Sequence, residues 1–133
     1  MVTYNGFTFV NTRSSSSNRT PFQQNGRWRV VPQDSSPLAY DSNVVYTKGL
    51  QISYDNQVFV NISSTSNTPY QNNNNRWRII IPENTAPTYN NQVRYYKDDR
   101  VTYSGTQYIA NVNYNGSIAP NRPPPGNNWQ VAP

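Results

Sequence analysis

A strand, a two-residue turn and a second strand recur three times in this chain of 133 residues, about fifty residues apart. The clearest copy runs from Val101 to Asn111, where apolar and polar residues alternate on either side of Ser104-Gly105. The alternation predicts two half-buried strands, and the Ser-Gly pair predicts a tight hairpin turn because Gly adopts a positive φ without steric cost. The other copies cover residues 2–11, with Asn5-Gly6 at the turn, and residues 52–61, with Asp55-Asn56.

A tryptophan follows each predicted hairpin after a polar loop that contains a proline. These residues, Trp28, Trp77 and Trp129, are 49 and 52 residues apart. The tyrosines in the first strands, Tyr4, Tyr54 and Tyr103, are 50 and 49 residues apart. Two independent landmarks therefore give one period, which is the sequence signature of a repeat architecture. We predict an all-β chain of three tandem modules, over residues 1–32, 37–82 and 86–133.

Two segments with a shared tyrosine pattern, residues 40–48 and 89–97, stand before the second and third hairpins. We interpret each as a strand that opens its module and covers one edge of the hairpin. The first module begins at its hairpin, so its opening strand is missing. Because an uncovered edge invites a strand from elsewhere, we expect residues 1–32 to be the docking end, completed by another subunit or by a surface such as a capsid.

Aromatic side chains dominate the apolar part of the composition, with 11 Tyr, 4 Phe and 3 Trp in a chain that is 34% hydrophobic. Three cores of this size are marginal alone, and the chain has no Cys for disulfides and no His or Cys for the usual zinc sites. We therefore expect no metal or cofactor, and assembly with other proteins or with copies of itself. The predicted structural core is Tyr4, Trp28, Tyr54, Trp77, Tyr103 and Tyr108.

No residue pattern indicates catalysis. General acid–base chemistry needs a His or a perturbed carboxylate, and a glycosidase needs two carboxylates that face each other across a cleft. The chain has no His, and Asp98 and Asp99 are adjacent, so their side chains diverge on an extended chain. We predict that the protein is not an enzyme and has no catalytic residues.

The formal net charge of +5 indicates a modest attraction to polyanions. Arg27-Trp28-Arg29 and Arg76-Trp77-Arg78 combine base and ring as single-strand nucleic-acid binders do. On a strand, however, the ring and its two neighbours point to opposite faces. A solvated arginine face is the simpler interpretation, and nucleic-acid binding stays a third alternative. No apolar run is long enough to span a membrane, and the N-terminus lacks the features of a secretory signal.

The third repeat resembles the short chitin- and cellulose-binding carbohydrate-binding modules of types 5 and 12. The residues that carry this resemblance lie between 86 and 133: Tyr89, Val93, Tyr95, Asp98, Asp99, Val101, Tyr103, Gly105, Tyr108, Ala110, Pro120 and Trp129. The second repeat matches over 37–82 with Asp55-Asn56 at the turn, and the first over 2–32 without an opening strand. The resemblance implies a small twisted β-structure.

The resemblance also implies a sugar site in which exposed rings stack on the apolar face of the sugar. The family often has a Trp shortly after its Tyr-x-Ala motif, and Tyr114 stands near that place here. The predicted carbohydrate-binding residues are Tyr114, Tyr96, Tyr70 and Trp129. Each Trp has an alternative interpretation as the core of its module, because a buried Trp commonly anchors so small a core.

The function expected from these observations is non-catalytic adhesion or assembly. A chain that resembles polysaccharide-binding modules, without an export signal or an attached enzyme, suits the surface of a bacteriophage virion, as a capsid decoration or as part of a tail or fibre. The alternative is a secreted protein that binds a polysaccharide such as chitin. Possible contact with surface polysaccharide is common to both hypotheses.

Overall fold

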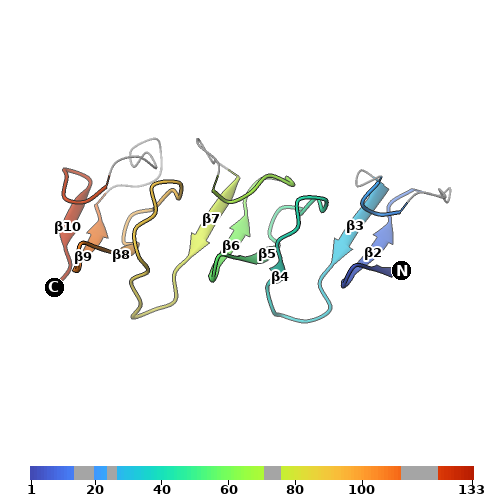
Figure 1. The fold of residues 1–133 in the computed structure, drawn as a ribbon, viewed down its shortest axis with the longest axis horizontal. Helices are drawn as coiled ribbons and strands as arrows, with labels where there is room; N and C mark the ends of the chain where they lie inside the picture. Colours follow the sequence, from blue (N-terminus) through green and yellow to red (C-terminus); the bar gives the residue numbers. More distant parts are fainter. Residues whose placement is uncertain (14–19, 24–26, 71–75, 112–122) are drawn as a thin grey trace.

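The computed structural model describes residues 1–13, 20–23, 27–70, 76–111 and 123–133. These residues form an almost purely β structure with three small sheets. The sheets follow one another in chain order along the longest axis of the molecule, so the N- and C-termini lie at opposite ends (Figure 1). The predicted all-β class is confirmed, while the division into modules at 1–32, 37–82 and 86–133 stays a prediction.

Strands of two to five residues build the sheets. The first sheet has the order β1-β2-β3 and contains β1 (Val2–Tyr4), β2 (Phe7–Asn11) and β3 (Trp28–Val31). The second has the order β4-β5-β6-β7 and contains β4 (Leu38–Ala39), β5 (Gln51–Tyr54), β6 (Gln57–Asn61) and β7 (Trp77–Ile80). The third has the order β10-β9-β8 and contains β8 (Arg100–Tyr103), β9 (Thr106–Ala110) and β10 (Trp129–Val131). Neighbouring strands are antiparallel, except β4 and β5, which are parallel.

The three predicted hairpins are present, each with a two-residue turn. Both turn residues have a positive φ: 47° and 81° at Asn5-Gly6, 51° and 58° at Asp55-Asn56, and 48° and 79° at Ser104-Gly105. Turns of this hand match the right-handed twist of the strands, which is why Asn, Asp and Gly favour them. The prediction of these hairpins from their turn residues is confirmed.

The closing strands pair with the hairpins in the same register in all three sheets. Trp28 lies opposite Asn11, Trp77 opposite Asn61, and Trp129 opposite Ala110. The sequence period thus corresponds to equivalent positions in space. It follows that a residue of one sheet can be compared with its counterparts in the others.

Aromatic rings fill the interior, as the composition predicts. Trp77 is buried, and Tyr4, Trp28, Tyr54 and Tyr108 are partly buried against the core. Tyr103 is half-buried and contacts the ring of Tyr89. The largest fully buried side chains are Tyr46 and Tyr95, which the predicted core did not include.

The predicted opening strands over residues 40–48 and 89–97 are wrong. Residues 40–48 form turns with a single β-bridge between Tyr46 and Thr65, and β4 ends before them at Ala39. A local hydrogen bond explains the turn, because Asp41 Oδ1 accepts the amide of Asn43 at 2.8 Å. Asn90 and Gln92 make the same bond, also at 2.8 Å. Val44 and Tyr46 are therefore apolar because both side chains insert into the core, and not because they lie on a strand.

The edge of the first hairpin is uncovered in the described part of the chain. In the second sheet β4 pairs with β5, and in the third a parallel bridge joins Thr88 to Thr102 on β8. The outer edge of β1 has no such neighbour among the described residues.

Candidate functional site

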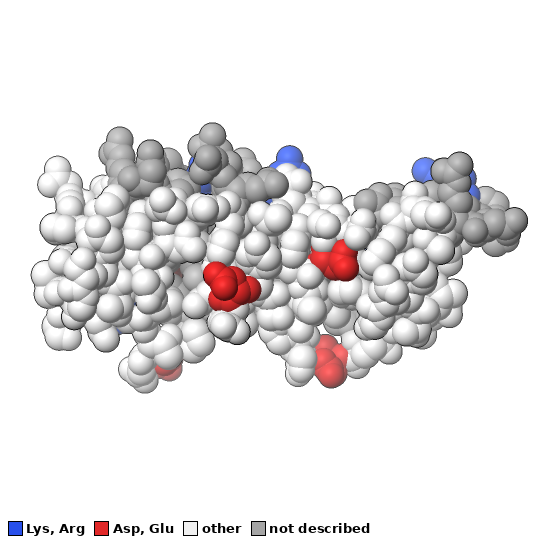
Figure 2. Space-filling model, viewed as in Figure 1, with Lys and Arg blue, Asp and Glu red and all other residues white. Residues whose placement is uncertain are grey.

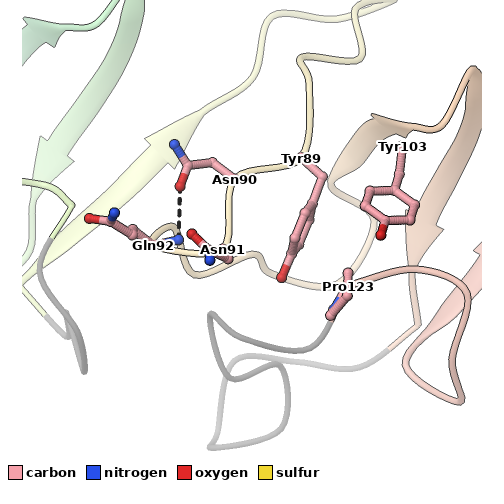
Figure 3. A pocket seen from close by; sticks show the side chains of 6 residues that line it. All are labelled: Tyr89, Asn90, Asn91, Gln92, Tyr103 and Pro123. Atoms are coloured by element: carbon pink, nitrogen blue, oxygen red, sulfur yellow. Dashed lines mark hydrogen bonds between the residues drawn. The ribbon is translucent and has the colours of Figure 1, made fainter.

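A pocket of about 540 Å³ lies in the third repeat. Figure 3 shows the rings of Tyr89 and Tyr103 with Pro123 at one side, and amide side chains from the following turn at the other. The lining residues are Tyr89, Asn90, Asn91, Gln92, Tyr103 and Pro123. The pocket thus combines rings and amides from three separate parts of the chain.

The backbone and the core hold the two rings in place. The amide of Tyr89 donates to the carbonyl of Thr102 at 2.8 Å, and its ring stacks on Tyr95 with centroids 5.6 Å apart. Tyr103 ends β8, and its ring stands perpendicular to that of Tyr89 at 5.7 Å. Because this edge-to-face arrangement is itself stabilising, the rings are preorganised before any ligand arrives.

The amide side chains come from the turn that replaces the predicted strand. Asn90 uses Oδ1 to accept the amide of Gln92 at 2.8 Å, and its own backbone amide donates to the hydroxyl of Tyr95 at 2.9 Å. Asn91 and Gln92 are exposed. A primary amide has both donors and an acceptor, so this turn offers hydrogen bonds of both kinds to a ligand.

No charged side chain lines the pocket among the described residues. Burial, with a smaller contribution from the neighbouring Tyr103, raises the pKa of Tyr89 to about 12. The phenol of Tyr89 therefore stays neutral at physiological pH and can donate a hydrogen bond. The wider surface is also weakly charged on the face seen in Figure 2, where acidic groups form separate small patches and basic groups lie along one margin.

Two predicted sugar-binding residues, Tyr70 and Tyr96, instead contact protein groups. The hydroxyl of Tyr70 donates to Asp55 Oδ2 at 2.8 Å, and its ring packs edge-on against Tyr54 at 4.9 Å. The guanidinium of Arg78 lies over the ring of Tyr96, 4.3 Å from the ring centroid. The second contact joins β7 to the segment before β8. Both rings thus contribute to packing where the structure describes them.

Trp129, the third predicted sugar-binding residue, is a core residue. It is 6% exposed and lies edge-on to Tyr89 at 6.0 Å and to Tyr95 at 5.6 Å. A ring enclosed in this way favours the alternative interpretation, in which Trp129 is the core of its module. Tyr114, the fourth, lies outside the described residues.

Carboxylates do not form a metal-binding group in the described ranges. Asp98 is exposed, whereas Asp99 is largely buried and accepts the backbone amide of Tyr96 at 2.7 Å. Burial raises the pKa of Asp99, against the opposing effects of this hydrogen bond and of Arg78. No group of three or more potential ligand residues is close enough to hold a metal ion there.

The arginines beside Trp77 point away from it, as predicted. Trp77 is 2% exposed, while Arg76 and Arg78 are exposed. At Trp77, ring and charge therefore do not converge on one ligand, as a single-strand nucleic-acid site would require. Among the described residues, no helix has the length and apolar character needed to span a membrane.

Comparisons of the sequence with protein-family models and with curated proteins find no match. The resemblance to carbohydrate-binding modules consequently stays a prediction. The predicted core includes Tyr103, and the predicted recognition residues include neither Tyr89 nor residues 90–92. The available signal was a tyrosine followed by three amides, Asn90, Asn91 and Gln92.

Proposed function

We propose that this protein is a non-catalytic adhesion protein that binds a neutral polysaccharide at the pocket beside Tyr89 and Tyr103. The observation that carries the proposal is the composition of the lining, which has two phenol rings, three amides and a proline but no charged side chain among the described residues. This lining suits an uncharged ligand with many hydroxyl groups better than an anion or a cation.

Rings and amides match the two kinds of surface on a sugar. A ring face or edge contacts the apolar C–H surface, while amides and phenols exchange hydrogen bonds with the hydroxyl groups. Asn91 and Gln92 are exposed and can adapt to a ligand, whereas Tyr89 is fixed by its neighbours. A β-linked polymer such as chitin or cellulose presents both surfaces along its length, so it is the proposed class of ligand.

The proposed setting is the surface of a virion, as a capsid decoration or a tail or fibre component. An elongated molecule with its termini at opposite ends supports this proposal (Figure 1), because one end can be anchored while the pocket in the third repeat faces outward. Many copies on one particle would also convert weak single contacts into high avidity. A secreted polysaccharide-binding protein is the alternative setting for the same site.

Co-sedimentation with insoluble chitin and cellulose tests the proposal. The parent chain should be retained by at least one polymer, and Tyr103→Ala and Asn91→Ala should each lower the retained fraction several-fold. The exposed residue Gln51, on β5 of the second sheet, provides the matched control Gln51→Ala. Retention of all three variants at the parent level would reject the pocket, and no retention of the parent on either polymer would reject these substrates.

A further inference from the structure

Two segments follow equivalent paths in the structure, and each covers one edge of its hairpin, in the second or the third sheet. These tyrosine segments are residues 38–50 and 87–99. Each first runs parallel to the edge of its hairpin. The amide of Thr102 donates to the carbonyl of Pro87 at 2.8 Å and its carbonyl accepts the amide of Tyr89, also at 2.8 Å. In the second sheet the carbonyl of Ser53 accepts the amide of Tyr40 at 3.1 Å.

Each tyrosine segment then inserts a ring beside the tryptophan of its sheet. Tyr46 meets Trp77 with centroids 5.7 Å apart and planes at 65°, and Tyr95 meets Trp129 at 5.6 Å and 67°. The hydroxyl of each inserted tyrosine accepts a backbone amide of its own segment. Two segments of different sequence thus complete their sheets with one geometry.

The first sheet has the same receiving groups, and no segment among the described residues covers them. Thr3 corresponds to Ser53 and Thr102, since each precedes the tyrosine that ends the first strand of its hairpin. Tyr4 and Phe7 close the two-residue turn, so the amide and carbonyl of Thr3 point away from β2, toward the open edge. Among the described residues, no strand pairs with that edge.

Side-chain exposure shows what the missing segment would cover. Val2 occupies the position of Ile52 and Val101, because each lies opposite an aromatic residue of the second strand. Ile52 and Val101 are 0% exposed, whereas Val2 is 42% exposed. Trp28 is likewise only half-buried, in contrast to the buried Trp77. The first sheet therefore presents a backbone edge beside an apolar surface, a combination that binds extended peptides.

We propose that the open edge of β1, with Val2, Thr3 and Trp28, is a docking site for a tyrosine segment supplied from outside residues 1–133. The occupant has a tyrosine that follows a parallel β-bridge, a valine four residues later and a second tyrosine after six. This pattern is common to the two segments already seated, in Tyr40, Val44 and Tyr46 and in Tyr89, Val93 and Tyr95.

A second copy of this chain does not meet the requirement. The described chain has three hairpin edges and two tyrosine segments, and both segments are used within their own sheets. Exchange of segments between copies would therefore uncover one edge for each edge that it covers. A segment from outside residues 1–133 covers the edge without this loss. This docking site is independent of the proposed sugar pocket, which lies in the third repeat.

A peptide with the sequence of residues 37–50 serves as the probe, added to the ¹⁵N-labelled full chain. We expect saturable shifts of the Thr3 amide and of the Trp28 indole N–H. A peptide with Tyr46→Ala should bind about tenfold or more weakly, because the ring that meets Trp28 is removed. Shifts confined to the second sheet, or none at any residue, would overturn the proposal.

Two chain variants separate the docking site from folding. Thr3→Pro removes the outward amide of Thr3. The fold should survive, because the β1–β2 ladder does not use this amide and an edge strand tolerates Pro there. Peptide binding should fall by about tenfold. Gln130→Ala, at an exposed position of β10, should bind like the parent chain. Circular dichroism checks that both variants fold. Self-association of the chain without peptide, with the Thr3 amide protected from exchange, would contradict the exclusion of a second copy.

Discussion

Tyr46 lies edge-on against Trp77, and its hydroxyl is hydrogen-bonded on both sides. The amide of Asp41 donates to it at 2.7 Å, and it donates to the carbonyl of Ala39 at 2.9 Å. The side chain is 0% exposed. One residue thus ties β4, the turn that follows it and the closing strand into a single core.

Tyr46→Phe should destabilise the chain by about 1–3 kcal/mol, because it keeps the ring but leaves buried backbone groups without their partner. Urea unfolding followed by tryptophan fluorescence measures this change. Gln51→Ala, at an exposed position, should stay within about 0.5 kcal/mol of the parent. Equal stabilities of Tyr46→Phe and the parent would show that the hydroxyl bonds contribute nothing net.

Stability should fall as the pH rises above about 10, the ordinary pKa of tyrosine. Burial raises the pKa of Tyr89 to about 12 and holds those of Tyr46 and Tyr95 well above the ordinary value of 10.0. Between the unfolded and folded pKa values the native state binds more protons than the unfolded state, so deprotonation favours unfolding. The stabilisation is fully present below pH 10 and is lost toward the folded pKa values.

Urea unfolding at a series of pH values from 7 to 12, with tyrosinate absorbance recorded in parallel, checks the alkaline loss. The tyrosinate absorbance that comes from the buried tyrosines should increase together with unfolding. The Tyr46→Phe variant should lose less stability over this pH range than the parent, because it has one fewer tyrosine with a raised pKa. A stability profile that stays flat to pH 12 would be incompatible with buried, neutral phenols.

Asn61→Ala should cost about 1–3 kcal/mol, since Asn61 is 1% exposed and bonds through both ends of its amide. Its Nδ2 donates to the carbonyl of Tyr46, and its Oδ1 accepts the amide of Ser63 at 2.7 Å. Asn11 occupies the same position in the first sheet and keeps the second kind of bond, with Arg13 at 2.8 Å. Asn11→Ala is the matched control and should cost less.

Thermal and urea unfolding of both variants decide this prediction. Ala110 at the corresponding place in the third sheet shows that alanine fits the register opposite tryptophan. A loss in Asn61→Ala would consequently come from hydrogen bonds and packing in the second sheet. An equal loss in Asn11→Ala would instead assign the effect to the bond that both asparagines share.

The hairpins could be predicted because their cause is local. Alternating residues and a pair that tolerates a positive φ determine a two-residue turn almost without reference to the rest of the chain. The strand predicted over residues 40–48 is absent for the opposite reason. Val44 and Tyr46 alternate as in a strand, but the bond between Asp41 and Asn43 turns the chain, and burial against Trp77 decides where Tyr46 points.

The candidate site could be predicted only in part. Loop position marks Tyr70 and Tyr96 as surface residues, but Asp55 reaches Tyr70 from the turn between β5 and β6, and Arg78 reaches Tyr96 from β7. The pocket arises where the turn after Tyr89 approaches the end of β8 and Pro123, and no spacing in the sequence encodes that meeting. Recognition residues of this kind depend on tertiary packing, which one sequence does not show.

Arg78 and Tyr96 should be energetically coupled, because the guanidinium lies 4.3 Å from the ring centroid. Arg78 belongs to β7 of the second sheet and Tyr96 to the segment that covers the third. A cation–π contact at an exposed site contributes about 0.5–1 kcal/mol.

Arg78→Gln, Tyr96→Leu and the double variant form a cycle that isolates this interaction. Urea unfolding of the four proteins should give a coupling of about this size, and Arg76→Gln with Tyr96→Leu should give a smaller one. Additive losses in the first cycle would show that this contact does not link the second sheet to the third.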